Sequence, residues 1–191
     1  MDWSGDSMQT PGINRRSFLK LGAFAAVAYP AIASATSSSA FVNAGSRTLS
    51  FINLHTGEKL KSVYWEGGKY VPENLASINR ILRDHRNGEI REIAPKLLDT
   101  LCEVAMELET REPFEIISGY RSPATNAKLR SQGHGVAEHS LHMDGLAVDV
   151  HVPGRSLALL RKTAIALKAG GVGYYPESQF VHIDVGRVRT W

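Results

Sequence analysis

The sequence predicts an α+β fold in which a small, mainly antiparallel β-sheet is flanked by helices. Segments typical of strands and segments typical of helices come in blocks along the chain, which favours this class over a regular β-α-β alternation. The composition is that of a globular protein, with 191 residues of which 43% are hydrophobic and 21% charged. This length is enough for one domain preceded by a tail.

The first half of the predicted domain contains a hairpin and two helices. Residues 47–65 alternate between apolar and polar side chains on both sides of a short turn, which predicts two paired strands. Apolar residues spaced three and four apart predict one helix over 73–86 and another over 95–109. Cys102 lies among the apolar residues of the second helix, so we expect a buried thiol. Because it is the single cysteine, an internal disulfide is excluded.

The second half of the domain adds three strands and two helices. Pro113 and Pro153 end the elements before them, because proline cannot donate a backbone hydrogen bond. The predicted strands are 114–118, 146–152 and 180–185, the predicted helices are 123–133 and 155–169, and a loop is predicted over 134–145.

An export signal is predicted at the start of the chain. Arg15 and Arg16 precede a short apolar run that ends at a small-residue site, a pattern similar to secretory signals of the twin-arginine type. The alternative is a membrane anchor, but an apolar run of about 13–15 residues is shorter than a spanning helix requires. We therefore expect a signal peptide over 1–35, a flexible leader over 36–46, a folded domain over 47–191 and a periplasmic location with no stable membrane span after processing.

The charged residues argue against a nucleic-acid partner. The net charge is +3, from 22 basic and 19 acidic residues, and the basic residues are scattered rather than gathered in a stripe. The histidines are more informative, because five of the seven lie beyond residue 130.

Residues 140–149 place a histidine and an aspartate close to a predicted strand. His142 lies at the end of a loop, and Asp149 lies inside the apolar strand that follows. Strand alternation puts Asp149 on the face opposite Val148 and Val150. A carboxylate in so apolar a strand requires a partner, because an unpaired buried charge is costly, and a metal ion is one such partner.

A second cluster lies in the last predicted strand. His182 and Asp184 share one face of this strand, and apolar residues occupy the other. If the two strands are neighbours, Asp149, His182 and Asp184 face the same space, and His142 reaches it from the loop. Two imidazoles and one carboxylate around an open position are the ligands of hydrolytic zinc sites.

These motifs resemble a known family. Ser-x-His-x-x-Gly-x-Ala-x-Asp over 140–149, followed by the His-x-Asp strand, resembles the D-alanyl-D-alanine metallopeptidases and their hedgehog-type relatives. Ser-Gly-Tyr-Arg-Ser at 118–122 and Gly-Gly-Val-Gly-Tyr-Tyr-Pro at 170–176 resemble, more narrowly, the murein endopeptidases within that group. The resemblance covers nearly the whole domain and implies an exported, monomeric zinc hydrolase that cleaves amide bonds in peptidoglycan cross-links.

The resemblance also implies roles for individual residues. His142, Asp149 and His182 are the expected zinc ligands. Arg121 is expected to bind a substrate carboxylate or the developing oxyanion, which a planar guanidinium suits; the alternative is a salt bridge within the turn. Tyr174 is expected to bind substrate, with packing within the sheet as the alternative.

The general base is the least determined role. Several relatives have an acidic residue three positions before the last zinc histidine, where this chain has Gln179. Asp184 is the first candidate, because it shares the face of His182, and Glu177 on the preceding loop is the second. A further alternative is that Asp184 only orients a ligand.

Other interpretations stay open at this point. A non-catalytic module that binds cell-wall peptides on the same fold is the alternative function. His134 and His139 are expected at the surface or at the rim of the site rather than among the ligands. His151 follows Asp149 on the same face, so it either supports the site or is unrelated to it.

Overall fold

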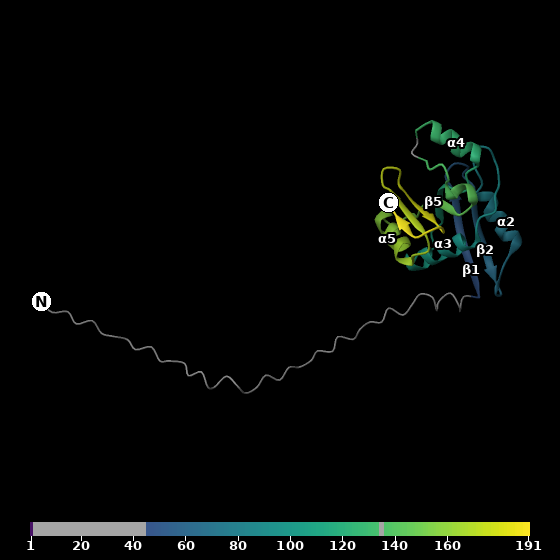
Figure 1. Ribbon diagram of the computed structural model, residues 1–191. Coiled ribbons are helices and arrows are strands. Elements are labelled where there is room, and N and C mark those ends of the chain that lie inside the picture. The colour runs from purple at the N-terminus through teal and green to yellow at the C-terminus, as the bar shows by residue number, and fades with distance from the viewer. Residues whose placement is uncertain (2–44, 134–135) are drawn as a thin grey trace. The chain divides into compact units, whose positions relative to one another are not determined.

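A single mixed sheet organises the part of the chain that the computed structural model describes, which is Met1, residues 45–133 and residues 136–191 (Figure 1). The elements in chain order are β1 (Ser46–Asn53), β2 (Lys59–Glu66), β3 (Lys69–Tyr70), α2 (Pro72–Ile81), α3 (Pro95–Glu107), β4 (Phe114–Ser118), α4 (Pro123–Ser131), the 3₁₀ turn η1 (Leu141–Asp144), β5 (Ala147–His151), α5 (Leu157–Leu167), β6 (Gly171–Tyr175), β7 (Phe180–Asp184) and β8 (Arg189–Thr190).

The α+β class is confirmed, but the prediction of a small, mainly antiparallel sheet is wrong. The sheet has eight strands in the order β3-β2-β1-β4-β5-β7-β6-β8, and it is mixed, because β1 pairs with β4 and β6 pairs with β8 in parallel. The sequence pattern does not reveal β3 and β8, which have only two residues each, or β6, whose glycines hide the strand pattern. The parallel pairing of β1 with β4 is possible because a hairpin and two helices separate them along the chain.

Helices α3 and α5 pack together, and they cover the core face of the sheet's central strands. Helix α3 also contacts β1, and α5 contacts β6 and β7. Helix α2 lies beside β2, so that α2 and α5 are found toward opposite ends of the sheet (Figure 1). The central strands contribute alternate apolar side chains to this core, namely Val148, Val150, Val181 and Ile183. The residues between them therefore face the other side of the sheet, where the polar cluster lies.

The four helices of the described residues are all shorter than the sequence predicts, and α2 and α5 differ most. The predicted helix 73–86 ends at Ile81, and the predicted helix 155–169 occupies Leu157–Leu167. Past Ile81 the chain turns, because the Asp84 carboxylate accepts hydrogen bonds from the backbone of Arg86 and Ser122 instead of facing solvent on a further helical turn. The predicted strand 114–118 has the predicted bounds.

The predicted signal peptide and leader lie outside the described residues, apart from Met1, Gly45 and Ser46, and they stay predictions. Among the described residues, no helix has both the length and the apolar character needed to cross a membrane. Cys102 is buried in α3, as predicted.

The core between α3 and the sheet yields a stability prediction. Leu98 of α3 is fully buried, whereas Met106 of the same helix is 41% exposed. Leu98→Ala is expected to lower the free energy of unfolding by about 2–5 kcal/mol, because it leaves a cavity in the core. Met106→Ala, the control, is expected to change it by less than about 0.5 kcal/mol. Urea unfolding measures both, and equal effects would contradict the placement of α3.

Candidate metal centre

Three buried side chains converge on the face of the sheet opposite α3 and α5. Asp149 of β5 and His182 of β7 are direct partners in the antiparallel register, and His142 arrives from η1. Asp149 Oδ1 lies 2.9 Å from His182 Nδ1 and 3.3 Å from His142 Nε2, and the two nitrogens are 3.1 Å apart. The sequence predicts this grouping, and the structure brings all three residues together.

The far nitrogen of each imidazole is already engaged. His142 Nδ1 lies 2.8 Å from the Gly119 carbonyl oxygen, and His182 Nε2 lies 3.0 Å from Asp184 Oδ2. Because a carbonyl and a carboxylate only accept, each of these nitrogens carries a proton. When both imidazoles are neutral, the three atoms that face one another are all acceptors with no hydrogen between them. A cation at their centre satisfies such an arrangement.

The charges of the cluster also favour a cation. Burial by itself would raise the pKa of Asp149, but His142 and His182 outweigh it and hold that pKa well below the ordinary value. Burial would lower the pKa of His182, but Asp149 and Asp184 raise it instead. A site that holds carboxylates ionised and favours positive charge suits a metal ion, and nitrogen and oxygen donors without thiolates suit zinc. These residues therefore fit a zinc ion.

Asp184 contacts the nitrogen of His182 that points away from the cluster, and both of its carboxylate oxygens accept hydrogen bonds. Its side chain is completely buried, and Oδ1 accepts from the backbone N–H groups of Gly171 and Gly186, each at 2.9 Å. Arg189 donates to both carboxylate oxygens, at 3.2 and 2.8 Å. Burial alone would raise the pKa of Asp184, but these bonds and His182 lower it. This placement favours the alternative in which Asp184 orients His182 over the role of general base, because both oxygens are occupied away from the three facing atoms.

A pocket of about 380 Å³ opens over the cluster. The described residues that line it outside the cluster include Arg121, His139, Tyr175, Phe180, Arg189 and Trp191. Tyr174, predicted to bind substrate or to pack within the sheet, lies against the core with Arg161 5.0 Å over its ring, a placement that favours the packing alternative. The alternation of β6 turns Tyr175 toward the pocket. This orientation could not be predicted, because the sequence pattern does not reveal β6 as a strand.

The remaining polar candidates lie apart from the three ligand atoms. His139 is exposed at the pocket, as predicted for a rim residue. Glu177 is exposed in the turn between β6 and β7 and does not line the pocket. His151 pairs with Glu115 at 2.9 Å, outside the cluster. His134 lies outside the described residues.

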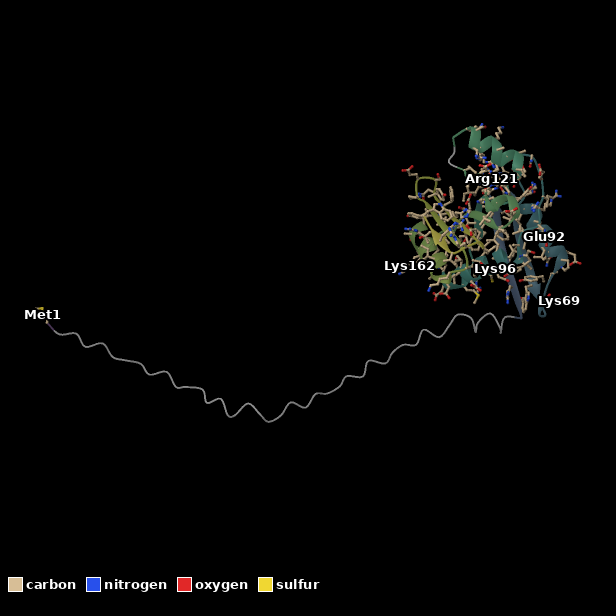
Figure 2. The ribbon with its side chains drawn as sticks, in the orientation of Figure 1. Met1, Lys69, Glu92, Lys96, Arg121 and Lys162 are labelled. Atoms are coloured by element: carbon tan, nitrogen blue, oxygen red, sulfur yellow. The ribbon has the colours of Figure 1, made fainter. Side chains whose placement is uncertain are left out.

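Arg121 projects into the pocket with few strong contacts. Its guanidinium lies 3.8 Å from Asp149 Oδ2 and makes only long hydrogen bonds, 3.4 Å to Ser118 Oγ and 3.5 Å to Asn126 Oδ1. Its Nε is buried without a hydrogen-bond partner. In Figure 2, Arg121 lies near the end of the domain that carries α4, away from Lys96 of α3 and Lys162 of α5. A buried, loosely held guanidinium is well suited to receive an anionic group.

Hydrogen bonds to the turn after α2 hold the segment that carries Arg121 in place. Tyr120 N donates to the Leu82 carbonyl oxygen at 2.7 Å, and Ser122 N donates to Asp84 Oδ2 at 3.0 Å. Gly119 is required here, because a Cβ atom on it would lie 2.3 Å from the Leu82 oxygen. The same segment supplies the Gly119 carbonyl that holds His142, so one brace positions both Arg121 and a candidate ligand.

Comparisons with known proteins match this sequence to one family. The family model described as peptidoglycan L,D-endopeptidase MepK matches residues 41–191. Peptidoglycan L,D-endopeptidase MepK of Escherichia coli (strain K12) is 46% identical over 180 residues, which cover 93% of this chain and 97% of that protein. Probable peptidoglycan L,D-endopeptidase MepK of Haemophilus influenzae is 38% identical over 146 residues, 76% of this chain and 78% of that protein.

The Asp84 brace generates a prediction about pH. Burial by itself would raise the pKa of Asp84, but hydrogen bonds from Thr125, Ser122 and Arg86 outweigh it and lower that pKa. A carboxyl whose pKa is lower in the folded state stabilises the fold above its unfolded pKa, about 3.9, and this contribution is lost as the pH falls through the folded pKa. Asp84→Asn is therefore expected to cost about 1–3 kcal/mol at pH 7, and the difference from the wild type is expected to shrink toward pH 2.

Urea unfolding at a series of pH values measures this difference. The exposed Glu112→Gln variant is the control, and its stability is expected to follow that of the wild type at every pH. If Asp84→Asn lowers the free energy of unfolding by the same amount at pH 7 and at pH 2, Asp84 does not stabilise the fold as an ionised, hydrogen-bonded carboxylate.

Proposed function

This chain belongs to the peptidoglycan L,D-endopeptidase MepK family, and we propose that it is a zinc-dependent hydrolase of amide bonds in peptidoglycan peptide cross-links. The observation that carries this proposal is the convergence of His142, Asp149 and His182 at the base of a pocket. Their facing atoms are acceptors within 3.3 Å of one another, an arrangement that a metal ion satisfies. The enzyme is a metallopeptidase, and peptidoglycan peptides are the proposed partners.

The proposed zinc ligands are His142 Nε2, Asp149 Oδ1 and His182 Nδ1. Three protein ligands leave room for a further ligand, as hydrolytic zinc sites require. When bound, zinc polarises a scissile carbonyl and makes water more acidic. The pocket holds the substrate against these residues, and the buried surroundings strengthen every charge interaction inside it.

We assign two supporting roles to the charged residues around the cluster. Arg121 receives a substrate carboxylate or the negative charge that develops on the scissile carbonyl, since its guanidinium is buried and loosely held. Asp184 fixes the proton of His182 on Nε2 and so directs Nδ1 at the cluster, and Arg189 holds Asp184 in place. Asp184 is therefore a positioning residue.

The proposal extends to the organisation of the whole chain. We propose a twin-arginine signal peptide over 1–35, a leader over 36–46, a zinc metallopeptidase domain over 47–191 and a periplasmic location. The consecutive arginines Arg15 and Arg16 support the twin-arginine export route. The periplasmic location is supported by the proposed substrate, because an enzyme that acts on peptidoglycan requires access to the periplasm.

Zinc content and hydrolysis test the central assignment together. The purified protein is expected to bind about one zinc ion, and His142→Ala and Asp149→Ala are expected to lose it, because each removes one of three ligands. His151→Ala is the matched control, since His151 lies on β5 but pairs with Glu115. Elemental analysis measures the zinc, and full zinc content in both cluster variants would contradict the assignment.

Digestion of purified peptidoglycan tests the reaction itself. The zinc-loaded protein is expected to release peptides whose masses correspond to hydrolysed cross-links, and Asp149→Ala is expected to release none. Mass spectrometry of the products identifies the bond that is cleaved. Binding of peptidoglycan by the wild type without any hydrolysis would support the non-catalytic binding module instead.

The role of Asp184 is tested by the variants Asp184→Asn and Arg189→Gln. Both disturb the group that orients His182, so each is expected to weaken zinc affinity about 10–100-fold. A competing zinc chelator measures the affinity. If Asp184→Asn retains wild-type zinc affinity while kcat falls about 10²–10⁴-fold, Asp184 is the general base and the positioning role is wrong.

The export route is tested by exchanging both arginines of the pair for lysine. Arg15→Lys with Arg16→Lys is expected to leave the precursor in the cytoplasm, because the twin-arginine route requires the pair. Cell fractionation and immunoblotting measure the distribution. The single exchange Lys20→Arg keeps the pair and is the control. Normal export of the double variant would contradict the twin-arginine route.

A further inference from the structure

The indole of Trp191 lies beside the candidate metal centre. Its ring centroid is 5.2 Å from that of His182, and its Nε1 donates a 2.7 Å hydrogen bond to Tyr175 Oη. Trp191 lines the pocket and remains 46% exposed. An aromatic ring held by a hydrogen bond, yet left half open next to the cluster, is available for contact with a ligand.

A glycine makes the position of this indole possible. Gly173 of β6 pairs with His182 of β7, and a Cβ atom on Gly173 would lie 2.7–2.8 Å from three atoms of the Trp191 ring. Real side chains do not approach so closely, so any other residue would displace the indole. This contact gives the last glycine of the Gly-Gly-Val-Gly run a physical role.

The backbone and a cation hold Trp191 from other directions. Trp191 N donates to the Val172 carbonyl oxygen at 3.2 Å, and the Trp191 carbonyl oxygen accepts from Tyr174 N at 3.1 Å. The guanidinium of Arg189 lies 4.8 Å from the indole centroid, and that guanidinium is itself bound to Asp184. The indole is therefore preorganised, which lowers the entropy cost of using it to bind a ligand.

Trp191 forms one wall of the pocket together with Tyr175 and Phe180, whose rings stack at 4.6 Å. We call these three residues the aromatic wall. Arg121 follows β4, and the aromatic wall belongs to β6, β7 and the residue after β8, so the wall and the guanidinium reach the pocket from opposite sides of the β5–β7 pair. Besides Arg189, which stacks on Trp191, the pocket thus has the Arg121 guanidinium on one side and the aromatic wall on the other.

We propose that Trp191 is a substrate-positioning residue that holds the aliphatic stem of a cross-linking side chain against the aromatic wall. This inference rests on the proposed function. A peptide cross-link runs through at least one side-chain amine or carboxylate, and the methylene groups that carry it form an apolar stem next to polar backbone. Aromatic rings bury such a stem, and their faces attract an ammonium group at its end. Gly173 is the residue that permits this wall.

Steady-state kinetics on a purified cross-linked muropeptide dimer tests the proposal with the zinc-loaded protein. Trp191→Ala is expected to raise KM about tenfold with kcat within about threefold, because it removes binding surface rather than chemistry. Trp191→Phe is expected to restore KM to within about threefold, since it keeps an aromatic ring. Gly173→Ala is expected to raise KM as Trp191→Ala does. Gly45→Ala, where an added Cβ meets nothing within 4 Å, is the matched control and is expected to change neither constant.

Tryptophan fluorescence supplies a second readout that does not depend on turnover. Mixing the dimer with the wild type in a stopped-flow instrument is expected to change the emission before hydrolysis, and Trp191→Phe is expected to abolish that change while it still hydrolyses the dimer. Trp65, which lies in β2 outside the pocket-lining residues, remains as an internal reference.

The outcomes separate this inference from the proposed function. If the wild type binds zinc but hydrolyses no cross-link, the proposed function fails. If the wild type hydrolyses the dimer and Trp191→Ala keeps the wild-type KM, or loses kcat alone, the positioning role of Trp191 is wrong. Loss of zinc from both Trp191→Ala and Trp191→Phe would assign the indole to support of the metal centre and would also overturn the proposal.

Discussion

The buried Asp149 carboxylate determines how the residues around the candidate metal centre are arranged. It lies in the middle of β5, between two valines that enter the core, and it is 6% exposed. Such a charge is stable only with compensation from nearby cations or donors. The antiparallel register supplies His182 directly across the strand pair, and η1 supplies His142. With the protons of both imidazoles directed outward, the centre of this cluster is left for a positive ion.

The surrounding residues can be understood as successive supports for these three side chains. Gly119 and Asp184 fix the outer nitrogens of the two histidines, and Arg189 in turn fixes Asp184. The absence of a side chain at Gly171 leaves the space that the ion pair of Asp184 and Arg189 occupies, because a Cβ atom on Gly171 would lie 2.4 Å from atoms of both residues. The geometry of the pocket therefore depends on residues that never face it, and substitutions at those positions act through the histidines.

Much of the site could be predicted from strand alternation, and its errors have physical causes. Alternation places Asp149 and His182 on the same face of the sheet, because the apolar neighbours of each residue along its strand enter the core on the opposite face. It placed Asp184 there too, but a shared face does not determine which nitrogen of His182 a carboxylate meets. For Tyr174, substrate binding and packing within the sheet could not be distinguished, because β6 is rich in glycine and its alternation is hidden in the sequence. Trp191 was missed because it follows a strand of two residues, which is held by pairing with β6 rather than by a pattern of its own.

The proposed metal centre holds a zinc ion between two imidazoles and one carboxylate. X-ray absorption spectroscopy at the zinc edge of the loaded wild-type protein tests it most directly. We predict nitrogen and oxygen scatterers at about 2.0–2.2 Å, with the outer-shell features of two imidazole rings. A sulfur scatterer at about 2.3 Å would implicate Cys102, which is buried in α3. That result, or the features of fewer than two imidazoles, would contradict the account.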